Sequence, residues 1–211
     1  EAHSFPTRRS SDLDEFAWMA ETLSVDGIAG LEVNVSCPNV ECEGMAFGVD
    51  PKVVESVTKA VRKVTDKPVI VKLSPNVTDI VEIAKAVEAG GGNGVSLINT
   101  LLGMAIDIHR RKPVLGNTYG GLSGPAVKPV ALRMVHQVYK GVTIPIIGLG
   151  GIMTGTDAIE FMMAGAQAVQ VGTATMVDPT AISRIAREMS EYVEQYNLNS
   201  ITDIVGAVHQ V

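Results

Sequence analysis

The stretch Leu31-Glu-Val-Asn-Val-Ser-Cys-Pro-Asn39 joins an apolar run to a polar ending. Val33 and Val35 suit a buried strand, and Pro38 marks its end because proline cannot donate a hydrogen bond to a neighbouring strand. One alternative is that Cys37 is only a small buried hydrophobic residue, as most free cysteines are. The stretch alone leaves that alternative open. If the strand ends at a cavity, the side chains that face it are Asn34, Cys37 and Asn39.

The bulk composition predicts a soluble, aliphatic-rich fold. The 211 residues are 46% hydrophobic but only 4% aromatic. The net charge of −6 argues against a nucleic-acid surface. No apolar run approaches the roughly 18 residues that would suggest a membrane span. We therefore expect the partner to be a small molecule.

The two cysteines predict neither a metal site nor a disulfide framework. Cys37 and Cys42 form no CxxC motif and have no matching histidine pair. This usage is typical of a protein in the reducing cytoplasm.

The first thirteen residues, EAHSFPTRRSSDL, do not resemble the rest of the chain. They lack the apolar core of a secretory signal and show neither helical nor strand periodicity. The string SFPTRRSSDL resembles read-through of a sequencing adapter, so residues 1–13 are interpreted as a non-native segment. Native sequence is expected to begin near Asp14.

Strand-like apolar runs alternate with helix-like periodicity after Asp14. Asp50 and Pro51 offer an N-cap followed by proline at the first helical position, and Thr78 can cap the next helix. The predicted strands cover residues 31–35, 67–73, 94–100, 144–151 and 168–173, and the predicted helices cover residues 14–23, 51–64, 78–87, 132–139, 158–164 and 179–196.

The segment from Leu101 to Gly121 interrupts this alternation. Residues 104–108 and 112–115 are strand-like and flank a basic turn, which predicts a hairpin excursion instead of a barrel strand. The charge run His-Arg-Arg-Lys at 109–112 is interpreted as a solvated turn.

Five strands separated by helices predict a parallel α/β fold, either an open doubly wound sheet or a barrel. No GxGxxG follows the first strand, as a dinucleotide-binding sheet would require. The last two strands instead end in glycines, at 148–151 and at 172, where barrels commonly bind phosphate after strands seven and eight. We therefore predict a TIM (β/α)8 barrel. Counting back makes residue 31 the start of strand four, so the chain is expected to be a C-terminal fragment with strands 4 to 8 that lacks roughly 95 residues.

Each predicted strand ends in residues that can carry chemistry, as a barrel active site requires. Lys72 lies between the apolar Val71 and Leu73, so its charge needs an anionic partner. Either glycine loop alone could be an ordinary turn. Together, after consecutive strands, they favour a phosphate cradle, because missing side chains let backbone amides approach an anion.

Six short motifs follow one another along the chain: NVSCPN at 34–39, VKLSPN at 71–76, INT at 98–100, GGLSGPA at 120–126, GLGGI at 148–152 and VGTA at 171–174. Together, in this order, they resemble the FMN-dependent dihydroorotate dehydrogenases. The resemblance covers nearly all of residues 14–211. Cysteine at position 37 resembles the class 1 enzymes, because class 2 enzymes carry serine there. Residues 39–48 and 106–117 resemble the B-type, NAD+-linked catalytic subunit.

The resemblance implies a role for each matching residue. Cys37 would be the general base that removes the C5 proton of dihydroorotate while hydride leaves C6 for flavin N5. A thiol whose ordinary pKa is about 8.5 can be tuned toward neutrality for that task. The substrate would be bound by Asn34, Asn39, Asn99 and Thr100. FMN would be held by Asn34, Lys72, Ile98, Gly124, Gly150, Gly151, Gly172 and Thr173, and no metal is implied.

The implied function is the oxidation of dihydroorotate to orotate in de novo pyrimidine (UMP) biosynthesis. Electrons would pass to NAD+ through a partner subunit with FAD and an iron-sulfur cluster, in a heterotetramer built on a homodimer of catalytic subunits. Two alternatives stay open, a dihydropyrimidine dehydrogenase-type domain and a non-redox phosphate-binding barrel. The fragment itself is expected to be inactive, because the missing strands would supply further flavin and substrate contacts.

Overall fold

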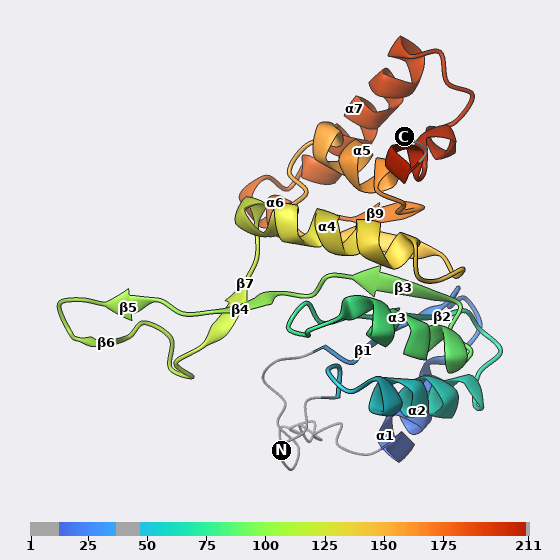
Figure 1. The fold of residues 1–211 in the computed structure, drawn as a ribbon, viewed down its shortest axis with the longest axis vertical. Coiled ribbons are helices and arrows are strands. Elements are labelled where there is room, and N and C mark those ends of the chain that lie inside the picture. The colour runs from blue at the N-terminus through green and yellow to red at the C-terminus, as the bar shows by residue number, and fades with distance from the viewer. Residues whose placement is uncertain (1–12, 37–46, 210–211) are drawn as a thin grey trace.

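Five parallel strands form the central sheet of the computed structural model, which describes residues 13–36 and 47–209. All five strand predictions are confirmed, and the observed strands are shorter than the predicted runs. Pro68 and Pro145, which precede two of them, cannot donate to the sheet ladder and delay its start. In sheet order, which is also sequence order, the strands are β1 (Leu31–Asn34), β2 (Val69–Lys72), β3 (Gly94–Leu97), β8 (Ile146–Leu149) and β9 (Ala168–Gln170) (Figure 1).

Helices occupy the connections, close to the predicted ranges. Asp50 caps the second helix as predicted, because its carboxylate accepts a hydrogen bond from Lys52 N at 2.8 Å. The prediction that Thr78 caps the third is wrong: Asp79, a stronger N-cap than threonine, accepts from Val81 N at 2.8 Å. The α-helices are α1 (Leu13–Leu23), α2 (Pro51–Arg62), α3 (Ile80–Ala89), α4 (Lys128–Tyr139), α5 (Gly155–Met163), α6 (Thr173–Val177) and α7 (Ala181–Gln195), and the 3-10 helices are η1 (Pro125–Val127), η2 (Ile201–Ile204) and η3 (Ala207–His209).

The helices cover one face of the sheet. Sequential strand order puts every right-handed crossover on the same face, whereas a doubly wound sheet reverses its order and carries helices on both faces. Helices α1 to α5 contact one another in turn along the sheet (Figure 1). Beneath them Val71 and Leu73 are fully buried, while Ile70 and Lys72 face the other way and are only partly buried. This arrangement confirms the barrel type of α/β fold.

The sheet curls toward the face without helices, which we call the inner face. β1 and β9 are the two edges of the sheet, yet Gln170 Nε2 donates a hydrogen bond to Glu32 Oε2 at 2.6 Å. In a flat sheet, four strand spacings would hold these edges roughly 19 Å apart. The inner face is therefore concave and corresponds to the inside of a partial barrel.

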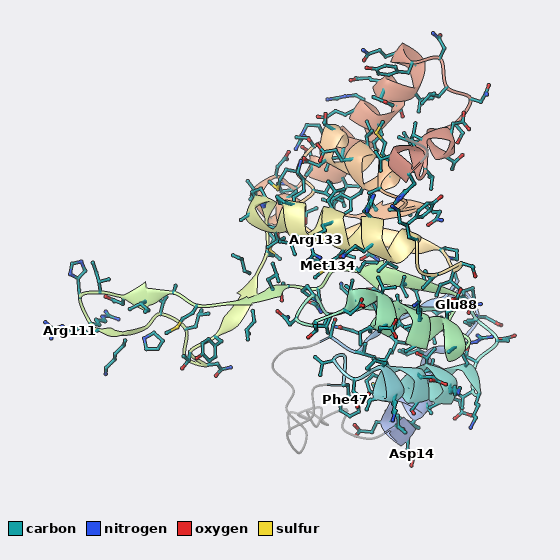
Figure 2. All side chains as sticks on the ribbon, viewed as in Figure 1. Asp14, Phe47, Glu88, Arg111, Arg133 and Met134 are labelled. Carbon is teal, nitrogen blue, oxygen red and sulfur yellow. The ribbon has the colours of Figure 1, made fainter. Side chains whose placement is uncertain are left out.

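Residues 101–122 form a projecting arm between β3 and η1 (Figure 1). The antiparallel pairing of β5 with β6 confirms the predicted hairpin, and the pairing of β4 with β7 at its base was not predicted. The basic turn is exposed as expected, with Arg111 at the tip of the arm, away from the body (Figure 2). The arm's strands are β4 (Leu101–Gly103), β5 (Ile106–Asp107), β6 (Lys112–Pro113) and β7 (Gly120–Leu122).

Residues 13–36 and 47–209 contain neither a membrane-spanning helix nor a cluster of metal-ligating side chains. None of their helices is long and apolar enough to cross a membrane. No group of three or more His, Cys, Asp or Glu side chains among them could hold a metal ion.

Candidate active site

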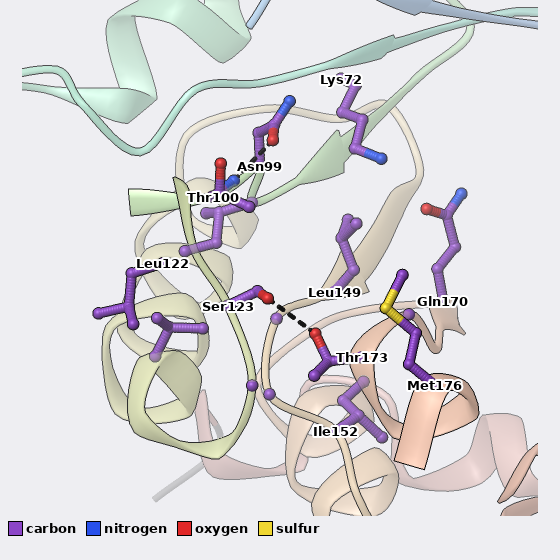
Figure 3. Close-up of a pocket in the computed structure, with 16 residues that line it drawn as sticks. Lys72, Asn99, Thr100, Leu122, Ser123, Leu149, Ile152, Gln170, Thr173 and Met176 are labelled. Carbon is purple, nitrogen blue, oxygen red and sulfur yellow. Dashed lines mark hydrogen bonds between the residues drawn. The ribbon is translucent and has the colours of Figure 1, made fainter. Parts of the chain in front are cut away.

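A cavity opens at the carboxyl ends of β2, β3, β8 and β9, the edge where a barrel carries its active site (Figure 3). Lys72 and Asn99 lie toward one end of it, and Ser123 and Thr173 lie toward the other. Among the described residues that line it, Lys72 is the one ionisable side chain. The lining includes nine residues that the sequence predicted for the site: Lys72, Ile98, Asn99, Thr100, Gly124, Gly150, Gly151, Gly172 and Thr173.

Asn34 and Asn99 come from strands that are not neighbours, and they meet through Ser36. Asn99 Nδ2 donates to Ser36 Oγ at 2.6 Å and to Asn34 Oδ1 at 3.2 Å. Ser36 is buried, and its Oγ donates to Asn34 Oδ1 at 2.6 Å. Sequence reasoning assigned no role to Ser36, although it stands inside the first motif. The cluster orders two amides, which can donate and accept at once, near one end of the cavity.

Asn76 orders the backbone beside Thr100. Its Nδ2 donates to Thr100 O at 3.1 Å, and its Oδ1 accepts from Leu102 N at 2.9 Å. Sequence reasoning included Asn76 in the second motif without assigning it a role. The Pro-Asn pair that ends both the first and the second motif is the signal that could have indicated one.

Glycines form much of the other end of the cavity. Gly150 and Gly151 have φ angles of 124° and 79°, and a Cβ on Gly151 would stand 2.7 Å from Gly124 O. A side chain is excluded there, so the backbone itself lines the cavity. Thr173 Oγ1 donates to Ser123 Oγ at 2.9 Å on the same side (Figure 3). Glycine backbone and hydroxyl groups in one place can bind an anionic group such as phosphate.

Asp157 fixes the loop after β8 that carries two of these glycines. Its Oδ2 accepts from Met153 N and Thr154 N, each at 2.9 Å, and its Oδ1 accepts from Lys128 Nζ at 2.6 Å. Burial raises the pKa of Asp157, but the hydrogen bonds from Lys128 and the two loop residues outweigh it and hold that pKa below its ordinary value. The hydrogen bond to Asp157 likewise raises the pKa of Lys128. The pair ties the glycine loop to α4.

Replacing Asp157 with asparagine is expected to destabilise the full-length protein by about 1–3 kcal/mol, the scale for leaving hydrogen-bond partners of a charge unsatisfied. Because the folded-state pKa of Asp157 is lowered, its stabilisation is present at neutral pH and is lost as the pH falls through that pKa. Melting temperatures of variant and parent should therefore differ at neutral pH and converge in acid. Thermal unfolding across that range is the measurement.

The matched control for Asp157 is Glu160→Gln. Glu160 Oε2 lies 3.0 Å from Lys128 Nζ, but its side chain is 39% exposed, so losing this pair should cost less than about 1 kcal/mol. If both variants melt like the parent at neutral pH, Asp157 does not anchor the loop.

Lys72 has a carboxylate partner on the inner face. Its Nζ lies 3.4 Å from Glu32 Oε1, and the other oxygen of Glu32 accepts the hydrogen bond from Gln170. Glu32 thus meets the expected need for an anionic partner, while contact between Lys72 and a flavin stays a prediction. Sequence reasoning assigned no role to Glu32 or Gln170, because their meeting depends on the curl of the sheet.

Two predicted site residues, Cys37 and Asn39, lie outside the described residues, so their predicted roles stay predictions. The described chain before them ends at Ser36, which bonds to Asn99 in the cavity wall. Asn34 itself does not line the cavity but contacts it through Asn99.

Known proteins similar to this chain agree with one another. Residues 5–193 match the family model of dihydroorotate dehydrogenase. The dihydroorotate dehydrogenase B (NAD(+)) catalytic subunits of Desulforamulus reducens and Geobacter sp. (strain M21) are 62% and 58% identical over 197 residues, which cover 93% of this chain and 65% of each relative. A crystal structure of DHODH from Eimeria tenella in complex with ferulenol shares the fold, with a TM-score of 0.79 at 23% identity, over 94% of this chain and 58% of that one. The chain spans 65% of the length of these curated relatives, and it belongs to the dihydroorotate dehydrogenase family.

Proposed function

We propose that residues 14–211 are the C-terminal part of a single FMN-binding barrel domain, in a protein that oxidises dihydroorotate to orotate in pyrimidine biosynthesis. The observation that carries the proposal is one cavity lined by Lys72, by the neighbouring amide and hydroxyl of Asn99 and Thr100, and by two glycine loops. The B-type catalytic subunits that resemble this chain support the choice of substrate.

The lining residues fit FMN at both ends. The phosphate of FMN needs donors without bulk, and the glycine loops with Ser123 and Thr173 supply them. The isoalloxazine ring gains negative charge on reduction, and Lys72 supplies positive charge toward the opposite end. No carboxylate stands among the described residues that line the cavity, so none there would contact an anionic cofactor directly.

FMN, when bound, supplies the two-electron redox chemistry, and the chain supplies position and electrostatics. Asn99 presents an amide group that matches the edge of an imide-like ring without adding charge, and Asn34 holds that amide in place. Thr100, held by Asn76, presents a hydroxyl beside them. Cys37 removes the C5 proton of the substrate.

The physiological acceptor is proposed to be NAD+, reached in the cytoplasm through a partner subunit that carries FAD and an iron-sulfur cluster. The relatives are named NAD(+)-linked catalytic subunits, which supports a partner. The arm also exposes apolar side chains, with Ile106, Ile108 and Val114 at 61%, 74% and 60% exposure, as surfaces that bind other proteins often do. We propose a homodimer of catalytic subunits within a heterotetramer.

The test of the function uses the purified full-length protein. It should carry a flavin spectrum that anaerobic dihydroorotate bleaches, and uracil or thymine added to the reduced protein should not reoxidise the flavin. A colourless protein, or one that reduces uracil, contradicts the proposal. Co-purification with an iron-sulfur flavoprotein supports the acceptor, whereas rapid fumarate-dependent turnover by the catalytic subunit alone contradicts it.

Gly172→Ala is expected to weaken FMN binding about tenfold or more, because the added methyl group takes space where donors approach the phosphate. A Cβ on Gly172 meets no protein atom within 4 Å, so the melting temperature should change little. Gly116→Ala on the arm is the matched control, since a Cβ there also meets nothing within 4 Å. Fluorescence titration of FMN compares the two, and equal affinities would place the phosphate elsewhere.

A further inference from the structure

We propose that Glu32 is a positioning residue for Lys72, and that its carboxylate sets how strongly the cavity favours a reduced flavin. The inference rests on the proposed function, because it takes Lys72 to lie beside the isoalloxazine ring. Glu32 does not line the cavity, whereas Lys72 and Gln170 do. Glu32 therefore acts through these two side chains.

The Glu32 carboxylate bridges two strands that are not neighbours. Oε1 lies 3.4 Å from Lys72 Nζ on β2, and Oε2 accepts from Gln170 Nε2 on β9 at 2.6 Å. Figure 3 shows Lys72 and Gln170 extending toward each other on the same side of the cavity. The side chains of Lys72 and Glu32 are 22% and 30% exposed, so water only partly screens the pair. One carboxylate thus orients both polar side chains at this end of the cavity.

The bridge lies where barrel packing brings side chains together. In a TIM barrel, each interior layer takes its side chains from alternate strands. With β1 as strand four and β9 as strand eight, Glu32 and Gln170 belong to strands that share a layer. Their hydrogen bond is therefore a contact that a closed barrel can keep.

The value of the bridge is positional and electrostatic. A partly buried ion pair contributes little to stability compared with apolar packing, so its presence calls for another reason. Lys72 has a long flexible side chain, and a fixed partner limits where its ammonium can lie. The negative charge of Glu32 also offsets part of the positive potential that Lys72 presents to the cavity. Because reduction adds negative charge to the flavin, removing the Glu32 charge should favour the reduced form.

Glu32→Gln tests this directly, since it keeps an oxygen that can accept from Lys72 but removes the charge. In the FMN-loaded full-length protein, the ratio of the dissociation constants of oxidised and reduced FMN should rise about tenfold, equivalent to about +30 mV for a two-electron couple. Dye-equilibrated potentiometry measures the shift. Glu82→Gln is the matched control: it removes the same charge from an exposed pair with Lys85 on α3 and should leave the potential unchanged.

Glu32→Ala removes both the charge and the hydrogen-bond acceptor, so comparing it with Glu32→Gln separates positioning from charge. The affinity for oxidised FMN, from fluorescence titration, should fall about tenfold in the alanine variant but stay within about threefold of the parent in the glutamine variant. An unchanged potential in Glu32→Gln with FMN still bound overturns the inference and leaves the proposed function intact. A parent protein that binds no FMN overturns the proposed function instead.

Discussion

Replacing Cys37 with alanine in the FMN-loaded full-length protein should slow flavin reduction by dihydroorotate about 10²-fold or more, the usual effect of losing a general base. The C5 proton of the substrate is activated by a neighbouring carbonyl, so a thiolate of moderate basicity is strong enough to remove it. FMN binding should persist, because the described cofactor cavity is built from other residues. Anaerobic stopped-flow at the flavin absorbance, in a single turnover, is the measurement.

Cys42→Ala is the control for this prediction, since it removes a thiol five residues further along the same stretch. Its flavin should be reduced at the parent rate. Reduction of the Cys37→Ala flavin at nearly the parent rate would show that Cys37 is not the base. If the Cys42→Ala flavin is also reduced at the parent rate, neither thiol is the base.

The sequence alone predicts the strands and much of the cavity lining because both depend on local patterns. Apolar runs that end in proline, asparagine or glycine mark the carboxyl end of each strand, and parallel strands bring those ends to one edge. Lys72 on one strand and Gly172 after another could therefore be predicted to line the same cavity before any contact between strands was known.

The residues that hold the site together are not visible in such patterns. Ser36, Asn76 and Gln170 act through partners on other strands, and their pairing depends on register and curvature. The wrong prediction of the α3 cap has a simpler cause: Thr78 and Asp79 can both cap a helix, and they are adjacent in the sequence. The strands β4 and β7 are short and lie at opposite ends of the arm sequence, so no periodicity in the sequence predicts their pairing.

Expressed alone, residues 1–211 are expected to aggregate or to remain partly molten, and to retain little FMN. Within the described residues, no strand pairs with the outer edge of β1 or of β9, and such edges expose unpaired backbone groups. An apolar cleft also opens beside β1, where Leu23 and Ile28 are 58% and 41% exposed. The net stability of a domain is only about 5–15 kcal/mol, which is too little to absorb such a loss of burial.

The inner face gives the same expectation for the cofactor. The curl of the sheet brings Glu32 and Gln170 together, but a barrel fills its interior with side chains from all of its strands. Without those neighbours, water reaches the Lys72 side of the cavity and weakens its hold on an anionic ring. Residues 1–211 are compared with the full-length protein by three measurements. Size-exclusion chromatography reports aggregation, calorimetry reports cooperative unfolding, and the flavin spectrum reports retained FMN. A monomeric, cooperatively melting, yellow protein from residues 1–211 would mean that the five strands suffice, and the count of eight would have to be abandoned.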